Sequence, residues 1–88
     1  QGGRMMEKFV IAILVDNQPG VLTRISSMFT RRGFNIDSLT VGETEDPNLS
    51  RITIVTHGDD SVRKQIIKQC KKLYNVMEVK VMDEEQRR

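Results

Sequence analysis

The segment from Asp16 to Leu22 carries the residues best suited to bind a small molecule. It reads Asp-Asn-Gln-Pro-Gly-Val-Leu and joins a dense apolar run to the start of a predicted helix. Backbone N–H groups in the first turn of a helix have no partner within the helix, and the helix dipole favours an anion there. Gly20, Val21 and Leu22 would therefore offer their amides to a carboxylate, and Gly20 would let a ligand approach the backbone closely.

The residues alone leave two interpretations of this segment open. Asn17 has a side-chain amide that donates and accepts hydrogen bonds, so it could hold a polar ligand. It could equally cap the helix, with Pro19 in the first turn, and such segments are more often caps and tight turns than binding sites. The surrounding fold has to decide between them.

Residue types that carry catalysis and metal binding are scarce. His57, the only histidine, stands at the end of a predicted strand, without a Ser, Cys or carboxylate at the spacing of a catalytic triad. Cys70, the only cysteine, falls on the apolar stripe of a predicted helix, which indicates a buried structural thiol. The acidic residues within 43–46 are typical of a solvated turn. We therefore predict no catalytic residue and no metal site.

Length and composition limit the chain to one small domain. Of its 88 residues, 38% are hydrophobic and 5% aromatic, so its core must be thin and built from Ile, Val, Leu and Met. The 14 basic and 12 acidic residues nearly cancel, which gives no strong case for binding nucleic acid or a membrane. No apolar run approaches the ~20 residues of a membrane span, and no signal peptide is visible, so we expect a cytoplasmic protein.

Hydrophobic periodicity predicts an alternation of strands and helices. Strands are predicted over residues 8–15, 34–41, 50–57 and 76–82, and helices from Val21 to Gly33 and from Asp59 or Asp60 to Asn75. Within 34–41 the apolar positions change parity, so a bulge is expected near Asp37 and Ser38. We assign residues 1–6 to a tag remnant and the chain start, 7–82 to one domain, and 83–88 to a charged tail.

The element order β-α-β-β-α-β predicts an α+β, ferredoxin-like fold. Right-handed crossovers place the first and third strands at the centre of a four-stranded antiparallel sheet with both helices on one face. The second strand is then an exposed edge, and pairing it with its copy would bury that edge, so we expect a homodimer. RNA-recognition modules share this fold but need aromatic residues on the central strands. Residues 50–57 have none and 8–15 have only Phe9.

Three segments resemble a known family. They are residues 17–22 (Asn-Gln-Pro-Gly-Val-Leu), 32–41 (Arg-Gly-Phe-Asn-Ile-Asp-Ser-Leu-Thr-Val) and 46–54 (Asp-Pro-Asn-Leu-Ser-Arg-Ile-Thr-Ile). The first is common to many amino-acid-binding ACT domains. The other two are more particular to the regulatory small subunit of acetolactate synthase (acetohydroxyacid synthase), which the chain resembles over nearly its whole length.

This resemblance implies a regulatory role without catalysis. Such subunits bind the catalytic large subunit, raise its activity and confer feedback inhibition by a branched-chain amino acid, usually valine. Thiamine diphosphate, Mg and FAD belong to that partner, and this chain would hold no cofactor. The effector lies between two ACT domains, and by position the resemblance implies contacts from one chain by Asn17, Gly20, Val21 and Leu22 and from the facing chain by Asn35 and Ile36.

Alternatives remain beside the resemblance. The segment 17–22 also permits an ACT amino-acid-sensing domain that stands alone or belongs to another metabolic enzyme, whereas Asp-Pro-Asn-Leu-Ser-Arg argues against it. An enzyme of the acylphosphatase type shares the fold, but its phosphate loop is missing from this sequence. Without the resemblance, Asn35 is a turn residue that follows Gly33. Many small subunits also carry a second, C-terminal domain, which these 88 residues do not include.

Overall fold

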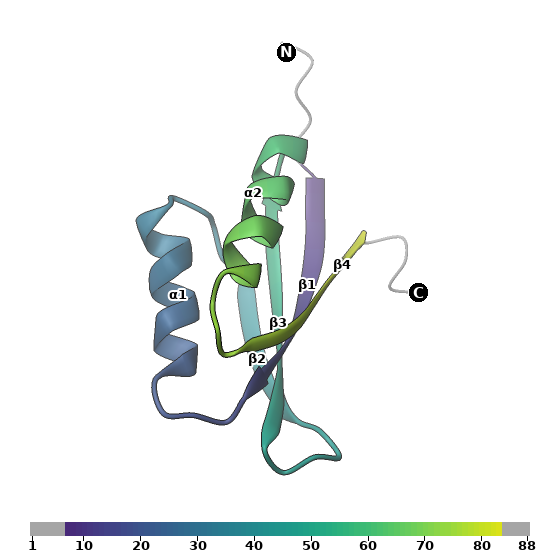
Figure 1. Cartoon of the computed structure of the whole chain (residues 1–88). Coiled ribbons are helices and arrows are strands. Elements are labelled where there is room, and N and C mark those ends of the chain that lie inside the picture. Colours follow the sequence, from purple (N-terminus) through teal and green to yellow (C-terminus); the bar gives the residue numbers. More distant parts are fainter. Residues whose placement is uncertain (1–6, 84–88) are drawn as a thin grey trace.

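The predicted order of elements is confirmed. The computed structural model describes residues 7–83, so segment 1–6 and all of the predicted tail except Asp83 lie outside the described residues. The elements, labelled in Figure 1, are β1 (Glu7–Asp16), α1 (Val21–Arg31), β2 (Ser38–Glu43), β3 (Leu49–Gly58), α2 (Asp60–Lys71) and β4 (Val76–Asp83).

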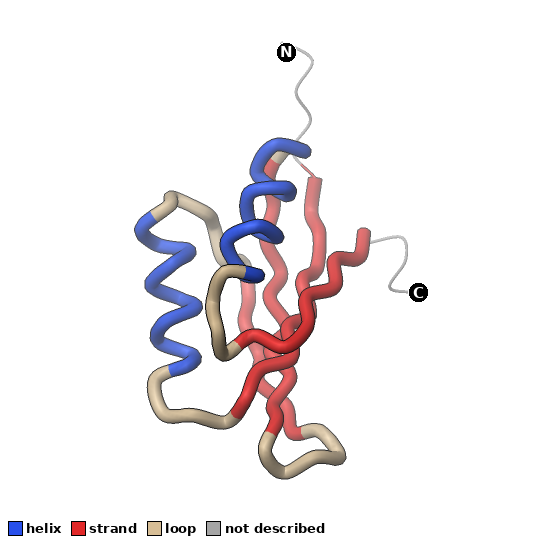
Figure 2. The backbone as a smooth tube through the Cα atoms, viewed as in Figure 1, coloured by secondary structure: helices blue, strands red, loops and turns tan. Residues whose placement is uncertain are grey.

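The four strands form one antiparallel sheet in the order β2-β3-β1-β4. As predicted, the first and third strands are central, and both helices lie against the same face of the sheet (Figure 2). This α+β, ferredoxin-like arrangement leaves β2 and β4 as the two edges. The β2–β3 hairpin and the loop between β1 and α1 lie at one end of the sheet, because Asp16 is paired with Leu49 there.

Alternation along the central strands builds the core. Ile11 lies opposite Ile54, and Ile13 lies opposite Ile52, so both pairs face the helices together. The fully buried side chains that pack around these pairs are Phe9, Val15, Ile25, Phe29, Ile66 and Cys70. Because the core lies on one side of the sheet only, these side chains stay buried only while both helices pack against that side.

The bulge expected near Asp37 and Ser38 is wrong, because β2 begins only at Ser38. The helix α1 is followed by Gly33 with a φ of 75°, which turns the chain, and Phe34 N–H then donates to the Phe29 carbonyl at 2.9 Å. The Phe34 ring also meets the Phe29 ring edge-on, with centroids 5.7 Å apart. Packing against the helix therefore holds Phe34 and its neighbours in a connection, and the parity change needs no bulge.

The helix ends differ in part from the prediction. Gly20, with a φ of 84°, occupies the N-cap of α1 without any side-chain cap, so the capping role considered for Asn17 is wrong. Asp59 caps α2 as expected, since its Oδ1 accepts from Val62 N–H at 3.0 Å. The same helix ends at Lys71 rather than at Asn75. Among residues 7–83, no helix is long and apolar enough to cross a membrane.

Candidate functional site

A hollow of about 150 Å³ lies at the end of β1, beside the start of α1. Its lining residues are Val15, Asp16, Asn17, Gln18, Gly20, Val21, Leu22, Val41, Ser50 and Ile52. Four of the predicted effector contacts, Asn17, Gly20, Val21 and Leu22, are therefore brought together. The volume is well below the roughly 300–1,000 Å³ of pockets for larger ligands, so the hollow suits a small molecule or one wall of a shared site.

The backbone at the start of α1 leaves amides available in this hollow. Val21 N–H donates a long hydrogen bond to the Gln18 carbonyl at 3.4 Å. This amide therefore has a partner within the chain, contrary to the expectation that it is free. Within residues 7–83, Gly20 and Leu22 have no backbone acceptor for their N–H groups. Gly20 has a left-handed backbone conformation, which residues other than glycine rarely adopt. Two amides and the helix dipole thus favour an anion at this position.

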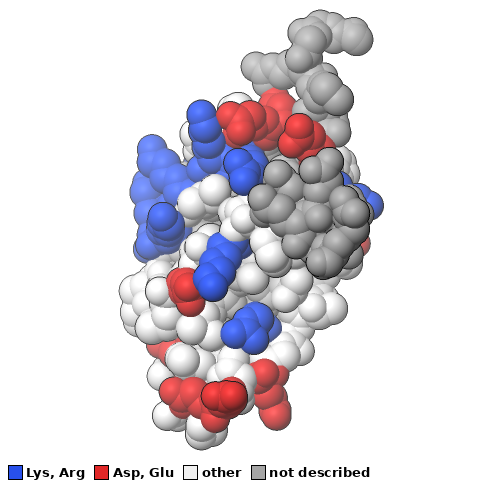
Figure 3. All heavy atoms as spheres, turned by 90° about the vertical axis from the view of Figure 1, so that its right-hand side faces the viewer, with Lys and Arg blue, Asp and Glu red and all other residues white. Residues whose placement is uncertain are grey.

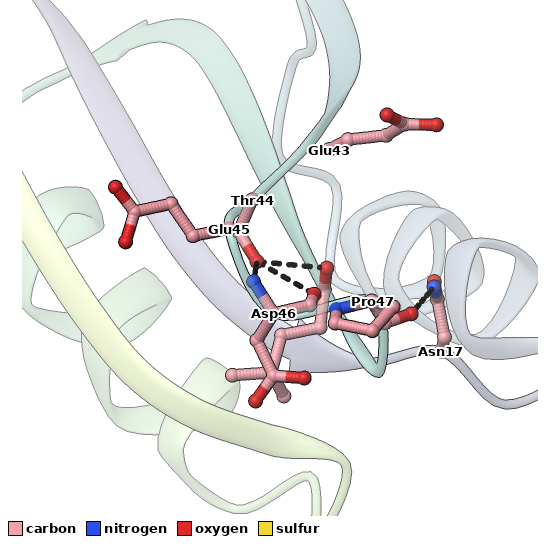
Figure 4. Close-up of a pocket in the computed structure, with 7 residues that line it drawn as sticks. Asn17, Glu43, Thr44, Glu45, Asp46 and Pro47 are labelled. Atoms are coloured by element: carbon pink, nitrogen blue, oxygen red, sulfur yellow. Dashed lines mark hydrogen bonds between the residues drawn. The ribbon is translucent and has the colours of Figure 1, made fainter.

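Asn17 fixes the loop to the neighbouring hairpin instead of capping the helix. Its backbone N–H donates to the Asn48 carbonyl at 2.9 Å, and its Nδ2 donates to the Pro47 carbonyl at 3.1 Å (Figure 4). Its Oδ1 accepts from Ser50 Oγ at 2.6 Å. An amide nitrogen carries two hydrogens and an amide oxygen two lone pairs, so one donor and one acceptor position of Asn17 remain for a ligand.

The apolar wall of the hollow comes from two exposed side chains. Leu22 is 42% exposed and Val41 is 52% exposed, whereas Val21 is 5% exposed and its side chain belongs to the core. Val21 therefore contributes backbone, not the apolar surface expected of it. Val41 is a lining residue that was not predicted, although its parity with Leu39 places it on the helix side of an edge strand, next to the start of α1.

Asn35 and Ile36, the two contacts expected from the facing chain, lie at the other end of the sheet. The Asn35 carbonyl accepts from Thr56 Oγ1, whereas Asn17 contacts Ser50. Six residues of a strand span about 20 Å, so within one chain the two halves of the predicted site do not meet. Ile36 is half-buried and packs partly against its own core.

A second hollow, of about 410 Å³, is lined by the β2–β3 turn and shares Asn17 with the first. The acidic residues around it do not converge: Figure 4 shows the carboxylates of Glu43 and Glu45 pointing in different directions. Polar groups of the turn bond to one another, since Thr44 Oγ1 donates to the Asp46 carbonyl at 2.9 Å. Figure 3 shows acidic side chains gathered at this hairpin end. Among the described residues, no group of three metal-ligating side chains comes together.

The single thiol lies in the core, away from both hollows. Cys70 is 0% exposed on the inner face of α2, and burial raises the pKa of its thiol from 9.0 to about 12. A thiol with such a pKa is almost entirely protonated at neutral pH, and the thiolate is the nucleophilic form. The structure is therefore consistent with the structural role predicted for Cys70.

Known proteins resemble this chain over most of its length. A family model described as an AHAS small subunit-like ACT domain matches residues 11–78. The probable acetolactate synthase small subunit of Archaeoglobus fulgidus is 56% identical over 77 residues, which are 88% of this chain and 48% of that protein. The acetolactate synthase isozyme 3 small subunit of Escherichia coli is 49% identical over 70 residues, which are 80% of this chain and 43% of that protein.

A solved structure shows the same fold with substantial sequence identity. The acetolactate synthase small subunit of Thermotoga maritima superposes with a TM-score of 0.81 at 47% identity, covering 88% of this chain and 48% of that one. This chain thus spans about half the length of the relatives it matches. Because the family match extends from within β1 into β4 and includes the loop at Asn17, the chain belongs to the family of acetolactate synthase (AHAS) small-subunit-like ACT domains.

Proposed function

We propose that this chain is the sensing domain of a regulatory acetolactate synthase subunit and binds a branched-chain amino acid, valine first, between two of its copies. The observation that carries the proposal is the hollow beside α1, which combines two backbone amides with two exposed apolar side chains. An aliphatic amino acid presents a carboxylate and a small apolar side chain in the same arrangement. The names of the relatives, all acetolactate synthase small subunits, agree with this assignment.

The unpaired edge of the sheet supports a homodimer. Strand β2 is hydrogen-bonded on one side only, to β3, among the described residues. If β2 pairs antiparallel with its copy, the start of one β2 at Ser38 lies beside the end of the other at Glu43. Such pairing carries Asn35 of the second copy toward the hollow that Val41 lines. The two halves of the site, about 20 Å apart in one chain, would then meet across the interface.

Each group of the effector would have a defined partner in this dimer. Its carboxylate would accept from the N–H groups of Gly20 and Leu22, and its side chain would lie against Leu22 and Val41. Its ammonium group would donate to the amide oxygen of Asn35 from the second copy. The remaining donor and acceptor positions of Asn17 would supply further polar contacts.

Regulation requires that the effector favours one state of the assembly over another. The proposed partner is the catalytic large subunit, which this subunit would bind and activate, and which holds the thiamine diphosphate, Mg and FAD. An effector between two copies stabilises one relative placement of those copies. The large subunit would then respond to that placement, and this gives feedback inhibition without any catalytic residue in the chain itself.

The experiment that tests the proposal is isothermal titration of the purified chain with L-valine, alongside its mass in solution. L-Leucine and D-valine serve as ligand controls. Leu22→Glu places a carboxylate in the hollow, where it repels the effector, while an acidic residue in the first turn suits the helix. Ser27→Glu adds the same charge on the exposed side of α1, outside the hollow.

The expected result is a dimer that binds L-valine, with binding lost in Leu22→Glu and kept in Ser27→Glu. A dimer that binds none of the three amino acids would overturn the effector assignment. A monomer that binds L-valine would overturn the shared site, because Asn35 could then not reach the hollow.

A further inference from the structure

His57 contacts two residues of the connection that leads into β2. Its Nδ1 lies 2.9 and 3.1 Å from the two carboxylate oxygens of Asp37, and its Nε2 lies 3.4 Å from Asn35 Nδ2. The side chains of His57 and Asp37 are 38% and 31% exposed, so both are within reach of solvent. His57 was expected only to be a strand-end residue, and it has no part in the function proposed above.

The contacts of the ring define which nitrogen carries the proton. A carboxylate can only accept, so Nδ1 of His57 must donate to Asp37. In the neutral imidazole Nε2 is then an acceptor, and it receives the N–H of the Asn35 amide. The neutral ring therefore draws the amide nitrogen of Asn35 toward itself and leaves the amide oxygen for another donor.

The backbone around Asn35 is held firmly, so the side-chain amide is the adjustable part. Thr56, a fully buried residue, donates its hydroxyl hydrogen to the Asn35 carbonyl, and Asp37 N–H donates to the Val55 carbonyl at 2.7 Å. Both bonds tie the connection to β3. A change at His57 would therefore act on the orientation of the Asn35 amide and not on the path of the chain.

We propose that His57 is a positioning residue for Asn35 and that protonation of its ring weakens effector binding. This rests on the proposed function, in which the Asn35 oxygen accepts from the effector's ammonium group across the dimer interface. A protonated ring has a hydrogen on both nitrogens, so Nε2 faces the Asn35 amide nitrogen donor to donor. Turning the amide over relieves this conflict, but it presents the nitrogen to the effector's ammonium group, which is also a donor.

Other charged groups also lie near His57. Lys8 lies directly opposite His57 on β1, Glu7 lies opposite the next residue, and Asp37 approaches from the connection before β2. Imidazole is the type of side chain that most often acts as a switch near neutral pH. Variants of His57 and of its neighbour Lys8 therefore assign a pH dependence of binding to one of the two side chains.

The first experiment is titration with L-valine at about pH 7.5 and 5.5. The native chain should bind roughly tenfold more weakly at the lower pH, because a hydrogen bond to a charged group is lost. His57→Gln, whose amide cannot ionise, should show the same affinity at both values. Lys8→Gln is the matched control, because it removes the neighbouring charge and should leave the pH dependence intact.

A second measurement needs no ligand. The side-chain amide signals of Asn35 in ¹⁵N-resolved NMR spectra should shift with pH, with the same midpoint as the ring protons of His57. In His57→Gln these amide signals should stay in place over the same range. A purely structural role for His57 would change the stability of the chain without coupling the two titrations.

The outcomes separate this inference from the function on which it rests. If L-valine binds with equal affinity at both pH values, the positioning role is wrong. It is also wrong if the Asn35 amide signals do not shift when the ring signals of His57 do. If L-valine binds at neither pH, the proposed function fails and with it the effect on binding. The NMR titration then still decides whether His57 orients Asn35.

Discussion

Asn75 Nδ2 donates a hydrogen bond to Asp16 Oδ1 at 2.8 Å, which joins the α2–β4 connection to the end of β1. The same side chain accepts from Arg24 on α1, and the Asn75 carbonyl accepts from Asp16 N–H at 3.1 Å. Asn75 is only 1% exposed, so its amide depends on these partners within the chain for its hydrogen bonds. Since Asp16 lines the hollow beside α1, the three bonds also hold one side of the proposed effector site.

Asn75→Ala should lower the free energy of unfolding by about 2–3 kcal/mol. The substitution removes the hydrogen bonds that the buried amide makes to the charged side chains of Arg24 and Asp16, and bonds to charged groups contribute about 1.5–3 kcal/mol. Urea denaturation followed by circular dichroism measures the change. Asn48→Ala removes the same amide from an exposed turn and should change stability by less than about 0.5 kcal/mol. Equal losses in both variants would show that the Asn75 side chain does not hold these elements together.

Stability should fall at alkaline pH because of Cys70. The folded state keeps this thiol protonated up to a pKa of about 12, whereas an ordinary thiol, as in the unfolded chain, has a pKa of 9.0. Above pH ~9 the unfolded state therefore binds fewer protons than the folded state, and the free energy of unfolding decreases as pH rises toward ~12. Between pH ~8 and ~10 the Cys70 contribution should amount to a loss of about 1.4 kcal/mol.

Cys70→Ala is the comparison that isolates this contribution. The variant should be less stable near neutral pH because it leaves a small cavity in the core, but it should lack the alkaline decrease that the thiol causes. Urea denaturation of both proteins at the two pH values gives the difference. A difference that does not change with pH would mean that the thiol ionises equally in both states.

The architecture could be predicted from the sequence because local pattern and packing agree. The dense apolar run of β1 and the alternation of β3 leave one way to bury Ile11, Ile13, Ile52 and Ile54 against two helices. The prediction failed where packing overrides local pattern. Phe34 alternates with Ile36 as in a strand, but contact with Phe29 keeps both out of β2.

The candidate site was predictable only in part, for a similar reason. Gly20 and Leu22 lie on one short segment, so their sequence positions alone bring them together. The contributions of Val41 and Ser50 depend on how the β2–β3 hairpin meets that segment, which requires the tertiary fold. Asn17 has the amide expected of a ligand contact, but the hairpin already uses half of its hydrogen-bonding capacity. No pattern in the sequence indicates this arrangement.

Val41→Lys should convert the proposed dimer into a monomer. Val41 is 52% exposed on β2, and a charge there would have to be buried when β2 pairs with its copy. Met77→Lys is a matched control, because Met77 is 53% exposed but lies on β4, the opposite edge. Light scattering after size-exclusion chromatography measures the mass of each variant. A monomeric Met77→Lys with a dimeric Val41→Lys would place the interface on β4 instead.

Ser50→Ala should weaken L-valine binding about fivefold, because a neutral hydrogen bond contributes about 1 kcal/mol. Ser50 Oγ donates to Asn17 Oδ1, and this bond helps to hold the loop in the position that presents Gly20 and Leu22. Ser26→Ala is the control, because its hydroxyl only returns to the Thr23 carbonyl within α1. Calorimetric titration of both variants gives the affinities. If Ser50→Ala binds L-valine as tightly as the native chain, the loop is positioned without this bond, and the backbone contact from Asn17 N–H to the Asn48 carbonyl must hold it.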